Sequence, residues 1–403
     1  MGRQETPGVW SIRYAHLLLT EFFLQIGLSV TRPIVSLYAL ELGSTVGVAG
    51  ALSGMLAIAA LVARPISGSL SDRFGKPSLL VLSCLLFDFS AVGIVLTGNL
   101  IALGVLLFVQ GLAFAMKSTV VIALVAELIP EEKIGAGVGW MSLAYTASQA
   151  VGPLIGSAVG WQFGYSEVFN LSVCFLSVGL LLALMFQFTG RSTKLNSKNN
   201  GFWHRHNGVR EPAKNATRSF LYASALPLSL VAGLLMVSQG TLAGFVLFVG
   251  NERGISGASL YFLCYALANF LSRPIAGRMS DRRSASFVVK PMLLVSIAAV
   301  LCLALTYNAL GVLLGGLLMG VGQGSAYSVL QSESVRGVPS DKSGRAANTF
   351  YIGPDIGMGL GPAIIGLIIQ SFGMTVGLLV CASLTAVSYL VFSRYWASSH
   401  ANA

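Results

Sequence analysis

The chain carries one sequence motif twice. Arg64-Pro-Ile-Ser-Gly68-Ser-Leu-Ser-Asp72-Arg73 recurs 209 positions later as Arg273-Pro-Ile-Ala-Gly277-Arg-Met-Ser-Asp281-Arg282, with seven of the ten residues identical. The same offset, without a gap, aligns two further sets of residues: Pro130, Lys133 and Gly135 with Pro339, Lys342 and Gly344, and Gly152-Pro153 with Gly361-Pro362. One register held over this length indicates a duplication, so we expect two matching halves.

The composition is that of a membrane protein. Charged residues make up 10% of the 403 residues, against about 25% in a soluble domain. Apolar residues make up 55%, the mean hydropathy is +0.77 and there are 46 glycines, a combination that suits helices packed closely in lipid. Crossing a bilayer takes about 20 apolar residues. Twelve such spans are predicted near 14–38, 47–70, 78–97, 100–128, 138–160, 167–189, 219–249, 256–277, 287–307, 310–331, 345–369 and 374–396.

These spans divide the chain into three parts. We expect an N-terminal six-helix bundle at 1–190, a cytoplasmic linker at 191–218 and a C-terminal six-helix bundle at 219–403. The predicted fold class is therefore an all-α membrane protein with two pseudo-symmetric halves. Parallel repeats of this kind form transporters whose substrate site lies at the midplane, where the halves meet.

The net charge of +10 has an explanation in membrane topology. Most Lys and Arg residues fall in the termini, the linker or alternate loops, with Arg32, Lys117 and Arg253 as exceptions. By the positive-inside rule, both termini are predicted to be cytoplasmic in a multi-pass cell-membrane protein. This placement argues against nucleic acid as a partner. The first apolar run is long enough to remain as a span rather than a cleaved signal.

Several functional classes lack their sequence signals. The chain has no phosphate-binding Gly-x4-Gly-Lys-Ser/Thr loop, no His-Glu-x-x-His motif and no paired cysteines. Its five cysteines are scattered through apolar segments, as is usual for small core residues. No combination of nucleophile and base stands out, so we expect no enzyme activity, no cofactor and no metal.

Three motifs carry a resemblance to a known family. The loop from Gly68 to Lys76 resembles the signature loop between helices two and three of the major facilitator superfamily. Helix five, with Gly152-Pro153, resembles the motif of antiporters in this superfamily, and helix eleven, around Asp355, resembles its drug and metabolite exporters. One departure is Leu107, which stands where that exporter group usually has an Arg before Gln110-Gly111.

The resemblance implies a secondary active transporter in which two halves rock about a central cavity lined by helices one, four, seven and ten. It favours export of a small organic compound, a drug or a metabolite, coupled to proton entry. Uptake of a polar nutrient is the alternative, and a membrane sensor that binds without transport is a third reading. The expected partners are a small-molecule substrate, protons and the lipid bilayer, with the chain working as a monomer.

Ionisable residues inside the spans are costly, at about 2.5–3.5 kcal/mol each on insertion scales, and usually have a function and a partner. Glu21, Gln25 and Arg32 lie on one face of helix one. Glu21 and Arg32 are about 16 Å apart along the helix, so each needs a partner elsewhere. The three form either a polar stripe on the cavity wall or two separate structural pairs.

Two further charged residues have alternative roles. Lys117 on helix four is a candidate cavity residue, or the partner of an acid such as Glu127. Asp355 on helix eleven is a candidate for carrying the coupling proton, since burial favours the neutral form of a carboxyl group; Glu21 is a second candidate. Asp355 could equally hold its helix against a partner.

The remaining site predictions concern uncharged and loop residues. Hydrogen-bonding contacts with a substrate are expected from Gln149, Gln239, Gln323 and Tyr327. A cytoplasmic gate that locks the halves is expected from Arg64, Asp72, Arg73, Lys76, Arg273, Asp281, Arg282 and Glu333. Helix bending is expected at Gly152, Pro153, Gly361 and Pro362, because neighbouring helices can satisfy the backbone groups that such residues free.

The duplication also shows where the halves differ. At the offset of 209, Asp355 corresponds to Thr146 and Glu21 corresponds to Leu230. The loop charges are repeated, whereas the charges inside the membrane are not. We therefore expect substrate and coupling residues among the unrepeated ones.

Overall fold

The computed structural model describes residues 11–129, 134–196, 222–336, 338 and 343–400. Within these ranges the chain is helical and has no strand. The helices are α1 (Ile12–Thr31), α2 (Ile34–Glu41), α3 (Val46–Phe74), α4 (Lys76–Thr97), α5 (Leu100–Leu128), α6 (Ile134–Phe163), α7 (Tyr165–Asn196), η3 (Ala223–Ala225), α8 (Leu226–Glu252), α9 (Leu260–Arg282), α10 (Ala285–Leu305), α11 (Ala309–Val335), α12 (Ser343–Phe372) and α13 (Met374–His400).

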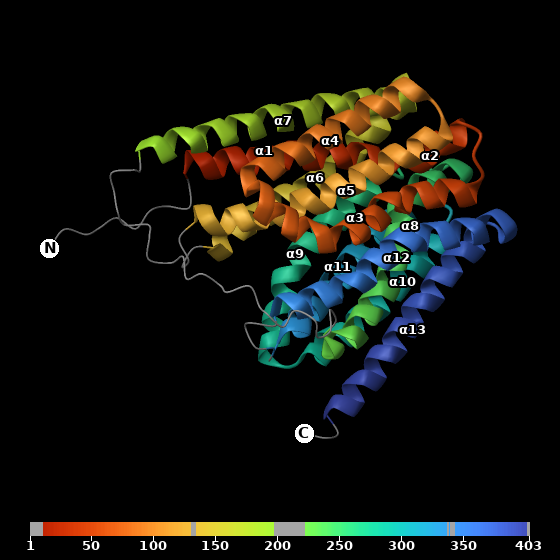
Figure 1. Cartoon of the computed structure of the whole chain (residues 1–403). Helices are drawn as coiled ribbons and strands as arrows, with labels where there is room; N and C mark the ends of the chain where they lie inside the picture. Colours follow the sequence, from red (N-terminus) through yellow and green to blue (C-terminus); the bar gives the residue numbers. More distant parts are fainter. Residues whose placement is uncertain (1–10, 130–133, 197–221, 337, 339–342, 401–403) are drawn as a thin grey trace.

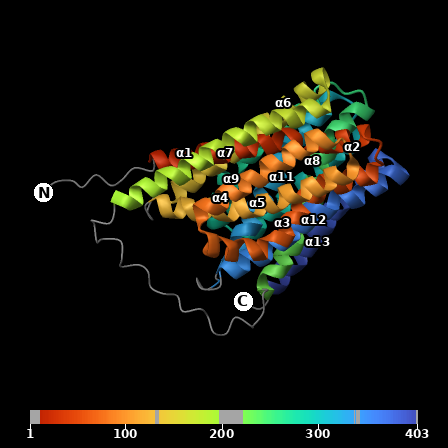
Figure 2. The same ribbon diagram turned by 45° about the horizontal axis from the view of Figure 1, so that its top comes forward.

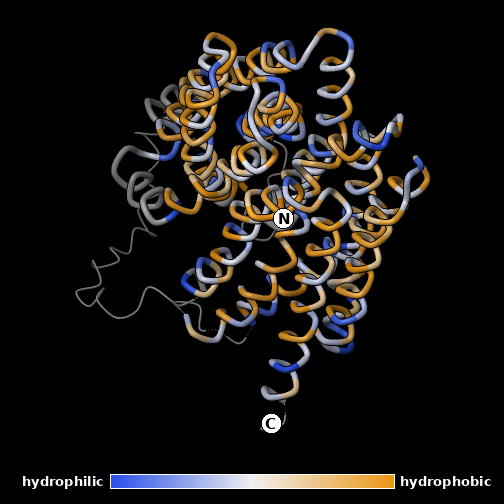
Figure 3. The backbone as a smooth tube through the Cα atoms, turned by 90° about the vertical axis from the view of Figure 1, so that its right-hand side faces the viewer, coloured by the Kyte–Doolittle hydropathy of each residue, from blue (hydrophilic) through white to orange (hydrophobic). Residues whose placement is uncertain are grey.

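Most of these helices can cross a membrane. Within the described ranges, nine are long and apolar enough by themselves, and the bent pair α1 and α2 makes a tenth. The other two long helices, α6 with 30 residues and α9 with 23, exceed the ~20 residues that span 30 Å. They are less apolar, and they pack against each other across the middle of the molecule. Hydrophobic residues cover most of the helical length (Figure 3). The chain is thus an all-α, multi-pass membrane protein, and the count of twelve spans stays a prediction.

The helix boundaries repeat at the offset of the sequence motif. The starts of α4 to α7 recur, each 209 positions later, as the starts of α10 to α13. The caps recur too: Asn99 and Asn308 accept hydrogen bonds from backbone N–H groups in the first turns of α5 and α11, as N-cap side chains do. The turns before α7 and α13 both use a glycine at positive φ, Gly164 at 96° and Gly373 at 89°. The duplication therefore extends from sequence to local structure.

The helices form two groups of extensive contacts. In the first, α1 packs on α6 and α7, and α5 packs on α3 and α4, which lie side by side with it in Figure 2. In the second, α8 packs on α12 and α13, and α11 packs on α9 and α10. Four pairs of helices in the described ranges join the groups through several contacts each: α3 with α12, α6 with α9, α2 with α8, and α3 with α8. Helix α7 continues to Asn196, into the expected linker, and the rest of that linker lies outside the described residues.

The groups are joined tightly at one end. The Gly47 N–H donates to Gln370 Oε1 at 3.1 Å, and the Ser36 hydroxyl donates to the Gly244 carbonyl. These contacts lie where α3 begins and α12 ends, the end predicted to face outward. Toward the opposite end, α7 and α13 spread apart on the two sides of the molecule (Figure 1). The described helices are thus closed at the end predicted to face outward and splayed at the opposite end.

The first predicted span, 14–38, is a broken helix. α1 ends at Thr31 and α2 begins at Ile34, with a bend of 42° between them. Pro33 lies at the break and has no N–H to donate to the preceding turn, which is the usual cause of a sharp kink. The break places Arg32 at the C-cap of α1, between the two helical segments of the span.

Candidate functional site

A buried ion pair joins α1 and α5. Lys117 Nζ lies 2.7 Å from Glu21 Oε1 and 3.3 Å from Gln25 Oε1. The two charged side chains are only 3% and 9% exposed, and the ammonium lies 5.2 Å from the ring centre of Phe114. One turn of helix separates Glu21 from Gln25, which lets both face Lys117. The acid that pairs with Lys117 is thus Glu21, whereas Glu127, the acid named in the prediction, pairs with Lys76.

A second ion pair crosses from one helix group to the other. Arg64 on α3 binds Asp355 on α12 through both carboxylate oxygens, at 2.5 Å from Nε and 3.1 Å from Nη2. The guanidinium also lies 5.0 Å from the ring centre of Tyr351. Such a two-point contact is the strong, directional form of an arginine–carboxylate pair. Arg64 thus has a partner on the wall of the central cavity, and its predicted place in the cytoplasmic gate stays a prediction.

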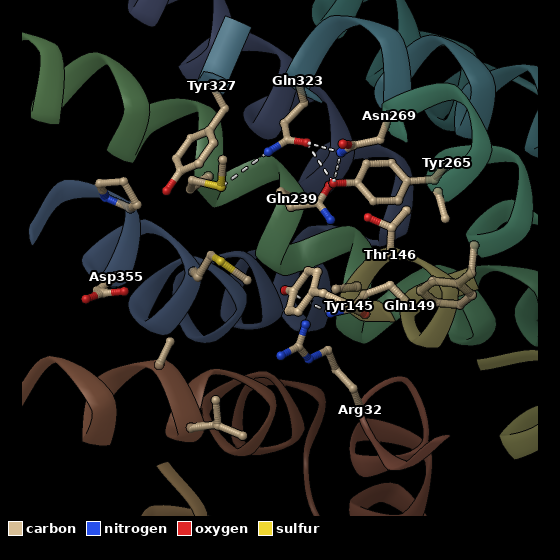
Figure 4. A pocket seen from close by; sticks show the side chains of 18 of the residues that line it. Arg32, Tyr145, Thr146, Gln149, Gln239, Tyr265, Asn269, Gln323, Tyr327 and Asp355 are labelled. Atoms are coloured by element: carbon tan, nitrogen blue, oxygen red, sulfur yellow. Dashed lines mark hydrogen bonds between the residues drawn. The ribbon is translucent and has the colours of Figure 1, made fainter. Parts of the chain in front are cut away.

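The central cavity lies between the two helix groups. Its volume is about 240 Å³, and it is lined by residues of α1, α3, α5, α6, α8, α9, α11 and α12 together with Pro33. Figure 4 shows Arg32 and Tyr145 on one side and Gln323, Asn269 and Tyr265 on the other. All four uncharged residues predicted to contact substrate line it: Gln149, Gln239, Gln323 and Tyr327.

The α9 and α11 side of the cavity carries an uncharged hydrogen-bond network. The Tyr265 hydroxyl donates to Gln323 Oε1 at 2.7 Å, and Asn269 Nδ2 donates to the same tyrosine oxygen at 3.0 Å. Gln239 Oε1 is buried without a partner in the described part of the chain. Sequence reasoning missed Tyr265 and Asn269. Their spacing of four residues on one helix, with an amide in mid-span, is the signal that was available.

Two arginines line the cavity without an ion-pair partner among the described residues, Arg32 and Arg273. Arg273, which was predicted at the cytoplasmic gate, lines this cavity, and its gating role stays a prediction. It also borders a second cavity of about 250 Å³, which is lined by Glu21 and Lys117 and shares Phe114 and Tyr145 with the first. The predicted stripe of Glu21, Gln25 and Arg32 is therefore divided: the first two face Lys117, and Arg32 faces the central cavity.

Other predicted gate residues lie near the inner ends of the helices. Asp281 accepts from Arg336 at 3.0 Å, and Arg336 lies 3.4 Å from Glu333, a partner that the prediction omitted. Lys76 pairs with Glu127. Arg282 is exposed. The side chains of Asp72 and Arg73 lie outside the described residues, so the duplicated gate stays a prediction.

The predicted helix-bending residues lie at close helix contacts. Helices α6 and α12 run without a break through Pro153 and Pro362. A Cβ at Gly152 would lie 2.5 Å from a side-chain atom of α1, and one at Gly361 would lie 2.9 Å from a backbone atom of α8. Both distances are too short for a real side chain. These glycines therefore let α6 and α12 approach their neighbours, and any bending role stays a prediction.

The fold and the site define a class of protein. A lined cavity between two repeated helix groups, bordered by membrane-embedded ion pairs and closed at one end, is the arrangement of a membrane transporter.

Comparison with known proteins gives the family. The model of the Major Facilitator Superfamily matches residues 17–353 and 228–402, and the chain belongs to this superfamily of transporters. An uncharacterized MFS-type transporter of Methanocaldococcus jannaschii is 22% identical over 361 residues, covering 88% of this chain and 91% of that protein. The multidrug resistance protein MdtG of Citrobacter koseri is 24% identical over 388 residues, covering 93% and 92%. The multi-drug resistance efflux pump PmrA of Streptococcus pneumoniae is 30% identical over 169 residues, covering 40% of this chain and 42% of that protein.

Solved structures share the fold at low sequence identity. A POT family transporter in complex with 5-aminolevulinic acid superposes with a TM-score of 0.77 at 13% identity, covering 95% of both chains. The nucleoside transporter NupG gives 0.73 at 13% identity, covering 96% of this chain and 99% of its own. These neighbours confirm the fold.

Proposed function

We propose that this chain is a secondary active exporter of a small organic compound, coupled to proton entry and working by alternating access. The observation that carries the proposal is the Arg64–Asp355 pair, which ties α3 to α12 at the edge of the cavity. The relatives named as multidrug resistance proteins and efflux pumps favour export over import. We further propose a monomer in the cell membrane with both termini cytoplasmic and with halves at 1–190 and 219–403.

The ion pair suggests how a proton could act. A proton on Asp355 removes the negative charge that holds Arg64 and so weakens a link between the two helix groups. Breaking an arginine–carboxylate pair in a poorly solvated site costs several kcal/mol unless the remaining charge finds another partner. An incoming substrate or water can provide that partner. Glu21 is the second proposed proton carrier, since its charge is balanced only by Lys117 among the described residues.

Proteoliposomes of known orientation with an imposed pH gradient test the proposal. Flux of test compounds is followed together with the internal pH. We expect Asp355→Asn and Glu21→Gln to abolish flux driven by the gradient while the protein still folds and binds. Glu167→Gln is the matched control, because Glu167 is exposed and its carboxylate accepts a hydrogen bond from Asn170, away from both ion pairs. Normal transport by both test variants at every pH would contradict the coupling role.

The same assay separates the alternatives. Counterflow that accumulates solute on the cytoplasmic side in the direction of proton movement would indicate an uptake symporter. Binding without flux under any gradient would indicate a sensor.

A further inference from the structure

The charges that line the central cavity do not balance. Three guanidinium groups face it, from Arg32, Arg64 and Arg273, but Asp355 is its only carboxylate among the described residues. Arg64 and Asp355 neutralise each other. In the second cavity, Lys117 and Glu21 do the same. Within the part of the chain that the structure describes, the positive charges of Arg32 and Arg273 are left without a counter-charge.

The internal duplication explains how this imbalance arises. Arg273 occupies in α9 the position that Arg64 occupies in α3, and Thr146 in α6 occupies the position of Asp355 in α12. The two helix interfaces correspond as well, since α3 packs on α12 and α6 packs on α9. One repeat therefore has an arginine facing a carboxylate, whereas the other has an arginine and a threonine. The Thr146 hydroxyl donates to the Ser142 carbonyl within its own helix and provides no charge.

The other unpaired arginine faces the same region. Figure 4 shows the Arg32 side chain rising into the cavity beside Tyr145, with Thr146 and Gln149 close by. Arg273, Thr146 and Arg32 all line this one cavity. An ionisable side chain at membrane depth is costly to place there and usually has a function. Two such groups, one from each repeat, therefore mark a place where an anion can bind.

We propose that the transported substrate is a compact organic anion whose carboxylate, phosphonate or phosphate group binds between Arg32 and Arg273, in the place that a carboxylate holds in the other repeat. This inference rests on the proposed transport function and names its substrate class. A guanidinium matches such oxyanions with two parallel hydrogen bonds. The cavity volume of about 240 Å³ lies below the ~300–1,000 Å³ usual for drug-sized ligands, which favours a small molecule. The positive field disfavours cationic compounds.

A matched series of ligands tests the charge preference. Phenylacetate and phenylphosphonate are compared with neutral phenylacetamide and cationic 2-phenylethylammonium, using thermal stabilisation of the purified full-length protein in detergent. A ligand that binds the folded state raises its melting temperature according to its concentration and affinity. We expect the two anions to stabilise and the other two compounds to do so weakly or not at all. Equal stabilisation by the amide or the ammonium, or none by either anion at the highest concentration tolerated, overturns the proposal.

Substitutions then place the anion. Arg32→Gln and Arg273→Gln should each weaken anion binding by roughly ten- to a hundredfold, the loss of one charged hydrogen-bonding partner. Thr146→Asp supplies the missing carboxylate from the protein itself. It should abolish stabilisation by anions, while the uncharged, similarly shaped Thr146→Asn retains it. Identical anion binding by the Asp and Asn variants overturns the proposed position even if the arginine variants fold poorly.

Failure of this inference can be told from failure of the proposed function. Anion binding in detergent without any gradient-driven flux in proteoliposomes would leave the binding site standing and contradict the exporter. Gradient-driven export of a cation, with no anion binding, would support the exporter and contradict the substrate class.

Discussion

Replacing Lys117 with Met removes the cation that faces Glu21, and replacing Glu21 with Gln removes the anion that faces Lys117. Their side chains are 3% and 9% exposed and meet at 2.7 Å, so either substitution alone leaves a charge in a poorly solvated place. The remaining group can escape that cost only by becoming neutral. The two single variants should therefore lose stability for related but distinct reasons.

The size of each loss has an upper limit. Keeping a carboxyl group of ordinary pKa about 4.3 neutral at pH 7 costs about 3.7 kcal/mol, and keeping an amine of ordinary pKa about 10.4 neutral costs about 4.6 kcal/mol. These limits agree with the roughly 3–5 kcal/mol measured when one partner of a buried pair is removed. For a unit of 150–250 residues, each kcal/mol lowers the melting temperature by about 2–4 °C. The expected decreases are at most about 7–15 °C for Lys117→Met and about 9–18 °C for Glu21→Gln.

The two variants should respond to pH in opposite directions. In Lys117→Met, the folded protein must take up a proton at Glu21, so its stability rises by up to about 1.4 kcal/mol for each unit that the pH is lowered below 7. In Glu21→Gln, the folded protein must release a proton from Lys117, so its stability rises as the pH is raised.

Thermal unfolding in detergent at pH 6, 7 and 8 measures both effects. The control is the double variant Glu21→Leu with Lys117→Met, which removes both charges and should recover most of the stability, because an apolar replacement of a whole buried pair is often neutral. The same pH dependence in both single variants would refute the reasoning. A double variant less stable than either single one would also refute it.

Other contacts give simpler predictions. Gly54→Ala would put a Cβ 1.8 Å from a carbonyl oxygen of α12. This variant should therefore prevent closure of the end predicted to face outward and abolish flux in proteoliposomes. Gly139→Ala, with open space around its Cβ, should leave flux unchanged. Arg253→Ala should lower the melting temperature. The Arg253 guanidinium donates to three carbonyls at the end of α10, and a buried acceptor left unpaired costs about 1–3 kcal/mol. The double variant Lys76→Glu with Glu127→Lys, which swaps the two charges, should change the free energy of unfolding by no more than about 1 kcal/mol in the same measurement. Both side chains are substantially exposed.

The sequence was sufficient for the helices and for their correspondence. Hydrophobic spans and turn glycines such as Gly164 are local signals, and a duplication transfers each of them from one half to the other. The predicted spans therefore fall within a few residues of the observed helices. The break at Pro33 was missed because the apolar run continues through it.

The partners of the buried charges could not be read in the same way. Arg64 begins a conspicuous sequence motif that suggested partners within that motif, whereas its contact with Asp355 arises from the packing of α3 on α12. Pairing across the two repeats depends on how the helix groups dock, which leaves no spacing pattern in the chain. Tyr265 and Asn269 were missed although their spacing of four residues was visible, because amides in membrane helices more often serve helix packing than binding.

The bend between α1 and α2 divides the first span into two helical segments that meet at an angle. Its inner segment packs on α6 and α7, while its outer segment reaches α8 in the opposite group. A straight helix would have to lose one of these two sets of contacts whenever the helix groups rotate against each other. The bend lets both sets of contacts persist. Unchanged transport by Pro33→Ala would show that the bend is dispensable. Arg32 lies at the bend, so a ligand that binds its guanidinium also acts on the angle between the two segments. Ligand binding in the cavity and the bend of the first span are therefore coupled.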